Sequence, residues 1–134
     1  FDAIQAAVIL SKLKIFDDEL SRRESVSRIY NQELKNIVET PITTNQVKSA
    51  WAHYTIRTRD RDGLREFLTK NSIPTMIYYP KGMHEQTAYQ KYHSGDPLIV
   101  SEKLCGEVLS LPLHPYMSEN QVYYVSGKVK EFIG

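Results

Sequence analysis

Residues 98–122, LIVSEKLCGEVLSLPLHPYMSENQV, carry signals for a helix, a strand and a second helix in that order. Just before them, Asp96–Pro97 predicts a helix start, because Asp accepts hydrogen bonds from unpaired amides and Pro fits the first helical position. Residues 109–111, Leu-Ser-Leu, predict a short strand that Pro112 ends. Residues 118–121, with Ser first and Gln last, form a capping-box pattern that predicts the final helix. This order of elements favours an α/β domain.

The preceding part of the chain adds two further strands, each followed by a polar or helical segment. Residues 50–58 alternate between apolar and polar positions, which predicts a strand. In this strand one face carries Ala52, Tyr54 and Ile56 and the other carries Trp51, His53 and Thr55. Asp60 or Asp62 can cap a helix that runs to about residue 71, and residues 74–79 predict another strand. We therefore expect an α/β fold with a small sheet of about three strands packed with helices.

Two helical segments precede this unit. Asp2 followed by Gln5 predicts a helix start, and residues 4–13, IQAAVILSKL, are apolar around most of the helix. Such a helix needs cover from another domain or a second subunit, or else lies in the centre of a core. Apolar residues from 16 to 37 recur at helical spacing and predict a long amphipathic helix. The predicted division is residues 1–38 for these helices and 39–134 for the small α/β domain, in one structural domain overall.

Composition excludes several classes of function. The 134 residues are 41% hydrophobic and 25% charged, which is ordinary for one globular domain. A net charge of +1 provides no field that attracts nucleic acid or an anionic membrane, and no apolar run is long enough to span a bilayer. The single cysteine, Cys105, cannot form an internal disulfide, and its apolar helix predicts a buried structural thiol. These features predict a cytoplasmic location and neither a nucleic-acid nor a membrane partner.

The candidate functional segment is residues 73–89, IPTMIYYPKGMHEQTAY. A short apolar strand stops at a proline and opens into a polar loop that carries Lys81 and His84. Because side chains alternate along a strand, Tyr78 and Tyr79 are expected on opposite faces, with one ring packed and the other meeting a ligand. The alternative is a strand that packs one Tyr beneath a solvated loop. The first of these interpretations makes this strand end a candidate ligand-facing edge.

The same segment resembles the C-terminal domain of nucleotide-sugar aminotransferases of the DegT/DnrJ/StrS type. In that family an aromatic pair precedes a proline, and a His-x-Gln-x-Ala-Tyr loop follows. Residues 1–14, FDAIQAAVILSKLK, and residues 98–122 agree with the family in the same order, and residues 51–57, WAHYTIR, agree more weakly. The matching stretches cover nearly the whole chain, so the chain is identified as a member of this family.

The resemblance implies the C-terminal small domain of a fold type I enzyme that uses pyridoxal phosphate. The Schiff-base lysine and most phosphate ligands of the family lie in a larger N-terminal domain, which is absent here, so the chain looks like a fragment with no catalytic and no cofactor-binding residue of its own. The implied substrate-binding residues are Tyr78, Tyr79, Lys81 and His84. Family members often have His where this chain has Tyr78, which makes Tyr79 the better candidate.

The implied reaction transfers an amino group, with glutamate as the expected donor, to a nucleotide-linked keto-sugar for cell-surface polysaccharide or glycan biosynthesis. The implied partners are the nucleotide sugar and the amino donor, and the implied assembly is a homodimer. The fragment alone is expected to be inactive. One alternative is a non-catalytic binding or dimerisation domain that uses the apolar face of residues 4–13. A second is a small unrelated enzyme based on His84 and Glu85, for which no further catalytic group is evident.

Two short motifs fail as functional signatures. His84-Glu85 begins like a zinc-protease helix, but Ala88 stands where the second His is needed. Residues 126–128, Ser-Gly-Lys, lack the upstream glycines of a phosphate-binding loop and lie inside a predicted amphipathic helix. The sequence therefore predicts neither a metal site nor a phosphate loop.

Overall fold

The computed structural model describes residues 2–44 and 46–134, so that Phe1 and Asn45, which belong to the matching N-terminal stretch and the connector, lie outside the described residues. The helices and strands follow one another as α1 (Ala3–Leu13), α2 (Phe16–Leu34), β1 (Tyr54–Arg57), α3 (Arg61–Lys70), α4 (Ile99–Glu107), β2 (Val108–Leu111) and α5 (Glu119–Ile133). Two short 3-10 helices, η1 (Met83–Glu85) and η2 (Gln90–Tyr92), lie between α3 and α4. The predicted α/β class is confirmed.

The sheet of the described residues has two antiparallel strands, in which Tyr54 pairs with Leu111 and Arg57 with Val108. The expectation of about three strands was too high. The predicted strand 74–79 contributes only an isolated bridge from Met76 to Ser110. Prolines at both ends of that segment lack the amide hydrogens that a longer ladder needs.

The first predicted strand is shorter than its sequence pattern. It begins at Tyr54 instead of residue 50, because Trp51 has a φ of 47° and turns the chain before the ladder starts. This turn also brings the Trp51 ring inside, only 4% exposed and 5.8 Å from the Tyr54 ring. The predicted alternation, which set Trp51 on the face opposite to Tyr54, is therefore wrong at this residue.

Local capping explains where most helices begin. At α1, the Asp2 carboxylate accepts a hydrogen bond from the Gln5 amide at 2.8 Å. At α5, Ser118 and Gln121 form the predicted capping box. Each cap satisfies amides that the first helical turn leaves unpaired. The α1 and α5 starts that the sequence predicts are confirmed.

The start of α4 differs from the prediction. The helix begins at Ile99, and the Leu98 amide donates to the carboxylate of Glu102 at 3.0 Å. Asp96 instead accepts a hydrogen bond from the Ser94 hydroxyl at 2.9 Å. The cap is therefore supplied from within the helix by Glu102, four residues after the amide that it satisfies.

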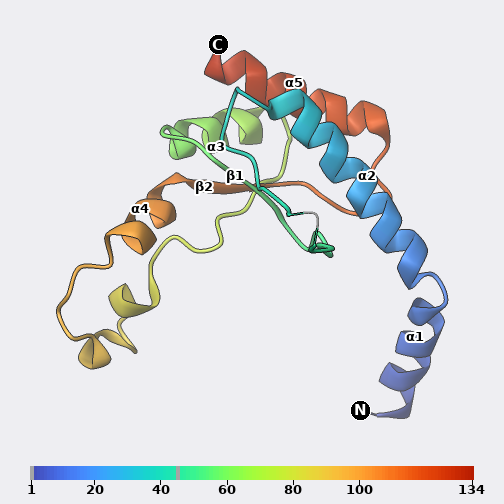
Figure 1. Ribbon diagram of the computed structural model, residues 1–134, viewed down its shortest axis with the longest axis horizontal. Coiled ribbons are helices and arrows are strands. Elements are labelled where there is room, and N and C mark those ends of the chain that lie inside the picture. Colours follow the sequence, from blue (N-terminus) through green and yellow to red (C-terminus); the bar gives the residue numbers. More distant parts are fainter. Residues whose placement is uncertain (1, 45) are drawn as a thin grey trace.

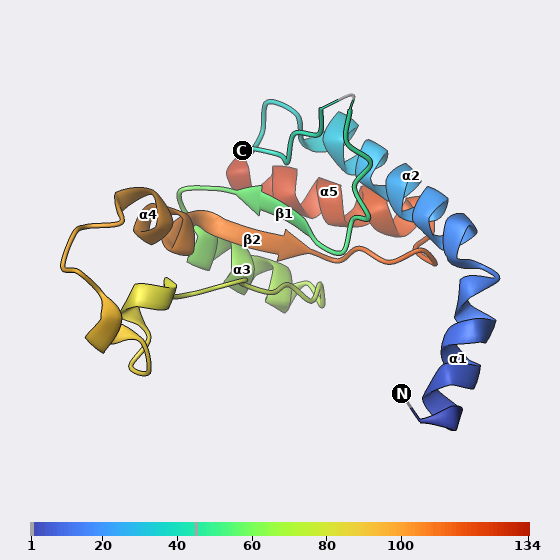
Figure 2. The same ribbon diagram turned by 60° about the horizontal axis from the view of Figure 1, so that its bottom comes forward.

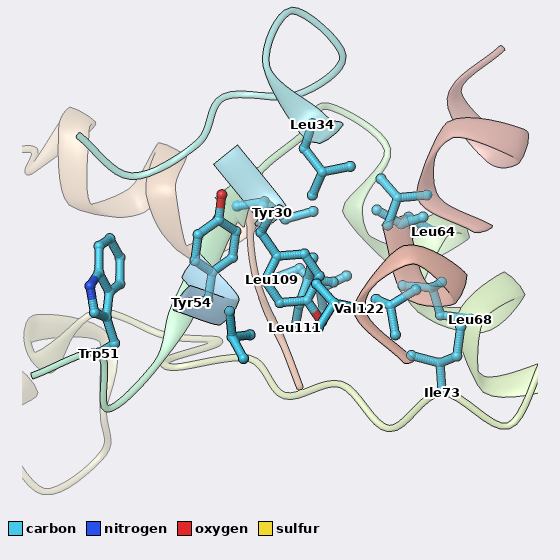
Figure 3. Packing of buried hydrophobic residues seen from close by; sticks show 14 residues of the cluster. Tyr30, Leu34, Trp51, Tyr54, Leu64, Leu68, Ile73, Leu109, Leu111 and Val122 are labelled. Atoms are coloured by element: carbon cyan, nitrogen blue, oxygen red, sulfur yellow. The ribbon is translucent and has the colours of Figure 1, made fainter. Parts of the chain in front are cut away.

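The core lies where α2 and α5 pack together over the two-stranded sheet, with α3 packed against α5 and β2 (Figures 1 and 2). Figure 3 shows the buried side chains meeting between these elements, with Trp51 at one end of the cluster. The buried apolar residues are Val26, Tyr30, Leu34, Trp51, Tyr54, Ile56, Leu64, Leu68, Ile73, Leu109, Leu111, Val122, Val125 and Val129. Among the described helices, α2, α3 and α5 contribute to this cluster.

Two fully buried tyrosines join α2 to the sheet. The rings of Tyr30 and Tyr54 lie 4.8 Å apart, and burial raises the pKa of both phenols. The Tyr30 hydroxyl donates to the carbonyl of Pro112 at 2.8 Å, and the Tyr54 hydroxyl donates to Asn31 Oδ1 at 2.6 Å. Both buried hydroxyls are thus paired, which the low polarity of the core requires.

The chain projects from this core at two ends. In both views α1 extends away from the body beyond the start of α2, while α4 and the loop that precedes it lie at the opposite end (Figures 1 and 2). The long helix α2 ends at Leu34, three residues before the predicted end at residue 37. None of the described helices is both long and apolar enough to cross a membrane.

Replacing Tyr30 by Phe should lower the free energy of unfolding by about 1 to 2 kcal/mol, because the Pro112 carbonyl loses its hydrogen-bond donor inside the protein. Urea denaturation followed by circular dichroism measures this change. The matched control is Tyr123→Phe on the exposed side of α5, where Tyr123 is 46% exposed. Equal losses for the two variants would contradict a role for the buried hydroxyl.

Candidate functional site

At the strand end predicted to face a ligand, the Tyr78 ring contacts two other aromatic side chains. The Tyr78 ring lies 4.4 Å from the His53 ring and 5.8 Å from the Tyr79 ring. Tyr78 is 40% exposed and Tyr79 is 69% exposed. The expectation that the two tyrosines occupy opposite faces, with one packed inside, is wrong, because no regular strand continues beyond the bridge at Met76.

A shallow hollow of about 230 Å³ adjoins the aromatic rings. Its wall brings together residues before β1, residues around the Met76 bridge, and the end of β2. It is lined by Ala52, His53, Pro74, Thr75, Met76, Tyr78, Ser110, Leu111, Pro112 and Leu113. Among the described residues, Thr75 Oγ1 is the one buried side-chain polar atom without a hydrogen-bond partner.

His53 is the residue of this arrangement that the sequence did not single out. No acidic residue stands near His53 in the sequence at a spacing typical of a catalytic pair. The aromatic ring that it contacts, Tyr78, lies 25 residues further along the chain. No sequence signal indicated the contact, which arises because the entry to β1 and the Met76 bridge flank β2.

His84 contacts a different set of groups. Its Nε2 lies 3.2 Å from Glu102 Oε1 on α4, and its side chain is only 10% exposed. The ring of His93 lies 4.9 Å from the His84 ring. Lys81 is exposed on the loop between Tyr79 and η1. The structure therefore places Tyr78 between His53 and Tyr79, while His84 is held against α4.

The chemistry of the exposed groups suits binding more than bond breaking. The Tyr79 phenol can donate to a hydroxyl, a carboxylate or a phosphate oxygen, and the Lys81 ammonium can donate to anions. No cluster of three or more His, Cys, Asp or Glu side chains in residues 2–44 and 46–134 has the arrangement of a metal site. Cys105 is half-buried, so the thiol is less buried than predicted.

The helix α1 presents a second unusual surface. None of its residues is buried, and Ile4 is 78% and Leu10 64% exposed. Its end is joined to α2 by Lys12, which pairs with Glu19 at 2.9 Å. Glu19 also accepts a hydrogen bond from the Tyr116 hydroxyl, and the bonds from Tyr116 and Lys12 lower the pKa of the Glu19 carboxyl. The helix is therefore attached at its C-terminal end while its apolar faces lack cover.

A profile of the DegT/DnrJ/EryC1/StrS aminotransferase family matches residues 1–130. The chain belongs to this family. A dTDP-3-amino-3,6-dideoxy-alpha-D-galactopyranose transaminase of Aneurinibacillus thermoaerophilus is 31% identical over 98% of the chain and 36% of its own length. A UDP-2-acetamido-2-deoxy-3-oxo-D-glucuronate aminotransferase of Pseudomonas aeruginosa is 34% identical over 87% of the chain and 32% of its own length. These relatives are nucleotide-sugar aminotransferases.

Solved structures agree with this family and with the observed fold. A DegT DnrJ EryC1 StrS aminotransferase from Brucella abortus superposes with a TM-score of 0.95 at 44% identity, covering all of the chain and 36% of that protein. S. venezuelae DesV in complex with a ketimine intermediate gives a TM-score of 0.92 at 30% identity over 99% of the chain and 37% of that protein. The chain spans about a third of the length of these aminotransferases.

Pyridoxal phosphate, which the resemblance implies, requires a lysine enclosed beside phosphate-binding groups. Lys81 is exposed, and the amines of Lys128 and Lys130 pair with Glu131 and Glu33. The remaining lysines of this family member are exposed in the structure as well. The described residues do not fit the cofactor, and we derive no chemical step through it.

The uncovered α1 should make the 134-residue chain self-associate, because burial of its apolar side chains removes them from water. Val8, which is 57% exposed, is a suitable test position. Val8→Glu should shift the chain towards monomer in sedimentation velocity, since a buried unpaired carboxylate opposes association.

The control is Ser25→Glu, which adds the same charge on the exposed polar surface of α2 and should leave the association unchanged. A wild-type chain that sediments as a monomer at high concentration would count against an associating α1 surface.

Proposed function

We propose that this chain is the C-terminal part of a pyridoxal-phosphate-dependent aminotransferase that transfers an amino group, with glutamate as donor, to a keto-sugar attached to a nucleotide. The observation that carries the proposal is the family match over residues 1–130 together with the 31% and 34% identity to nucleotide-sugar aminotransferases. The chain spans about a third of those enzymes, so the cofactor site is assigned to the rest of the protein. The chain by itself is then inactive.

The contribution of this domain is to bind and orient the sugar nucleotide. Tyr79, 69% exposed at the strand end, supplies a phenol that donates a hydrogen bond to the substrate. Lys81, two residues further on and exposed, supplies a positive charge for an anionic group such as the diphosphate. Tyr78 packs against His53, and this contact restricts the backbone from which Tyr79 projects. Orientation of this kind lowers a barrier because less freedom is lost when the reaction occurs.

The uncovered α1 fits the same proposal. In the longer protein its apolar side chains would be covered by the cofactor-binding part of the chain or by a second subunit of a homodimer. The pairing of Lys12 with Glu19 would then fix the direction in which α1 leaves the small domain.

In the full-length enzyme, Tyr79→Phe should slow amination of the keto-sugar while the half-reaction with the amino donor stays nearly unchanged. The phenol is placed at the sugar, whereas the donor half-reaction uses groups outside this chain. Loss of one neutral hydrogen bond corresponds to about 0.5 to 1.5 kcal/mol, or roughly a threefold to tenfold loss in kcat/KM for the sugar nucleotide. Single-turnover kinetics of the two half-reactions measures both rates separately.

The control is Tyr92→Phe on η2, which removes the hydroxyl of another exposed tyrosine, 74% accessible, in the same loop. It should leave both half-reactions unchanged. Equal losses in the two half-reactions of Tyr79→Phe would instead assign the phenol to cofactor placement or folding, and no loss in either would remove it from the binding site.

A further inference from the structure

The carboxylate of Glu102 joins two separate parts of the chain. One oxygen, Oε1, accepts a hydrogen bond from the Leu98 amide at 3.0 Å and lies 3.2 Å from His84 Nε2. A carboxylate only accepts hydrogen bonds when ionised, so the proton of a neutral His84 lies on Nε2. Glu102 thus caps α4 and, through the same atom, fixes the orientation of the His84 ring.

The His84 ring is tightly confined on its other sides. The His93 ring lies 4.9 Å from it, and its side chain is 10% exposed. Gly82 packs against the ring so closely that a Cβ at this residue would lie 2.6 Å from His84 Cε1 and 2.8 Å from Nδ1. The φ of Gly82 is −61°, which any residue adopts, so it is the position of the ring that requires glycine here.

The contact matters because the loop has few others. In residues 80–93 the backbone hydrogen bonds stay within the loop, such as Glu85 to Gly82 at 3.0 Å and Tyr92 to Tyr89 at 2.9 Å. No residue of η1 or η2 is buried. Within the described part of the chain, the pair of His84 and Glu102 is the one hydrogen bond that joins residues 80–93 to the remainder.

We propose that Glu102 is a positioning residue that holds the loop 80–93 against α4 through His84, and thereby places Lys81 and the adjoining Tyr79 for the substrate. The first half of the proposal is that Glu102 holds the loop in place. The second half, that the held loop places Lys81 and Tyr79 for the substrate, rests on the proposed function, because it assumes that the loop meets the sugar nucleotide.

Hydrogen–deuterium exchange of the full-length enzyme, read from peptides within residues 82–92, tests the first half. Glu102→Ala should speed amide exchange there by about tenfold, the factor expected when one hydrogen bond to a charged acceptor is lost. Glu102→Gln, whose amide oxygen still accepts from both donors, should restore most of the protection. Glu107→Ala on the same helix, which removes a contact with Arg57 at 2.5 Å, should leave these peptides unchanged.

A double-mutant cycle separates the His84 contact from the cap of α4. His84→Ala alone should reproduce the faster exchange, and adding Glu102→Ala to it should change exchange of residues 82–92 no further. An additive effect, or unchanged exchange in Glu102→Ala, would overturn the proposal.

A second variant keeps Glu102 and disturbs His84 instead. Gly82→Ala should push the ring away from Glu102 and speed exchange in the same peptides, whereas Gly106→Ala on α4, where a Cβ meets open space, should not. Protection that survives in Gly82→Ala would also overturn the proposal.

Kinetics of the same variants tests the second half. Glu102→Ala should raise KM for the sugar nucleotide by roughly threefold to tenfold, leave the amino-donor half-reaction unchanged, and recover in Glu102→Gln. Faster loop exchange with an unchanged KM would confirm the role of Glu102 in holding the loop and would show that the assignment of this loop to the sugar nucleotide is wrong.

Discussion

The position of the candidate site depends on the backbone of Ser110 in β2. Both of its backbone groups bond to Met76, with the Ser110 amide donating at 2.8 Å and the Met76 amide donating at 3.1 Å. On the other side of β2, Ser110 faces Thr55 of β1. Because the backbone groups of Ser110 are already bonded to Met76, Ser110 and Thr55 form a non-hydrogen-bonded antiparallel pair, in which the side chains approach closely. The hydroxyls of Thr55 and Ser110 indeed lie 2.8 Å apart. One residue thus joins β1 to the segment that ends in Tyr78 and Tyr79.

This central strand separates a packed side of the domain from the exposed end that holds the candidate site. Leu109 and Leu111 are buried in the core with Tyr30 and Tyr54, whose hydroxyls are paired and whose rings hold α2 over the sheet. Beyond Met76, Ile77 still packs against that core, but the segment then leaves it, so the rings of Tyr78 and Tyr79 stay exposed. A rigid core beside an exposed loop is a common way to place binding residues, because the scaffold fixes the loop ends while the loop remains free to contact a ligand.

The exposed end is held by contacts between side chains instead of by a longer sheet. His53 packs against Tyr78 where β1 begins, and Glu102 binds His84 where α4 begins. At the opposite end, Lys12, Glu19 and Tyr116 connect α1 to the body in a similar way. The two projecting segments of the domain, the loop 80–93 and α1, are thus each attached through a polar contact, and their outer surfaces remain exposed.

The sequence alone determined the features that depend on neighbouring residues. The Asp2 and Ser118 caps act within three residues, residues 109–111 mark β2, and the motif at residues 73–89 identified the family. The tertiary structure decided what depends on residues far apart in the chain. It limited the third predicted strand to one bridge, turned Trp51 inward, set His53 beside Tyr78, and gave Glu102 its contact with His84, 18 residues away. Caps and periodicity act within one or two turns, whereas these contacts exist only after β1, β2 and α4 have come together.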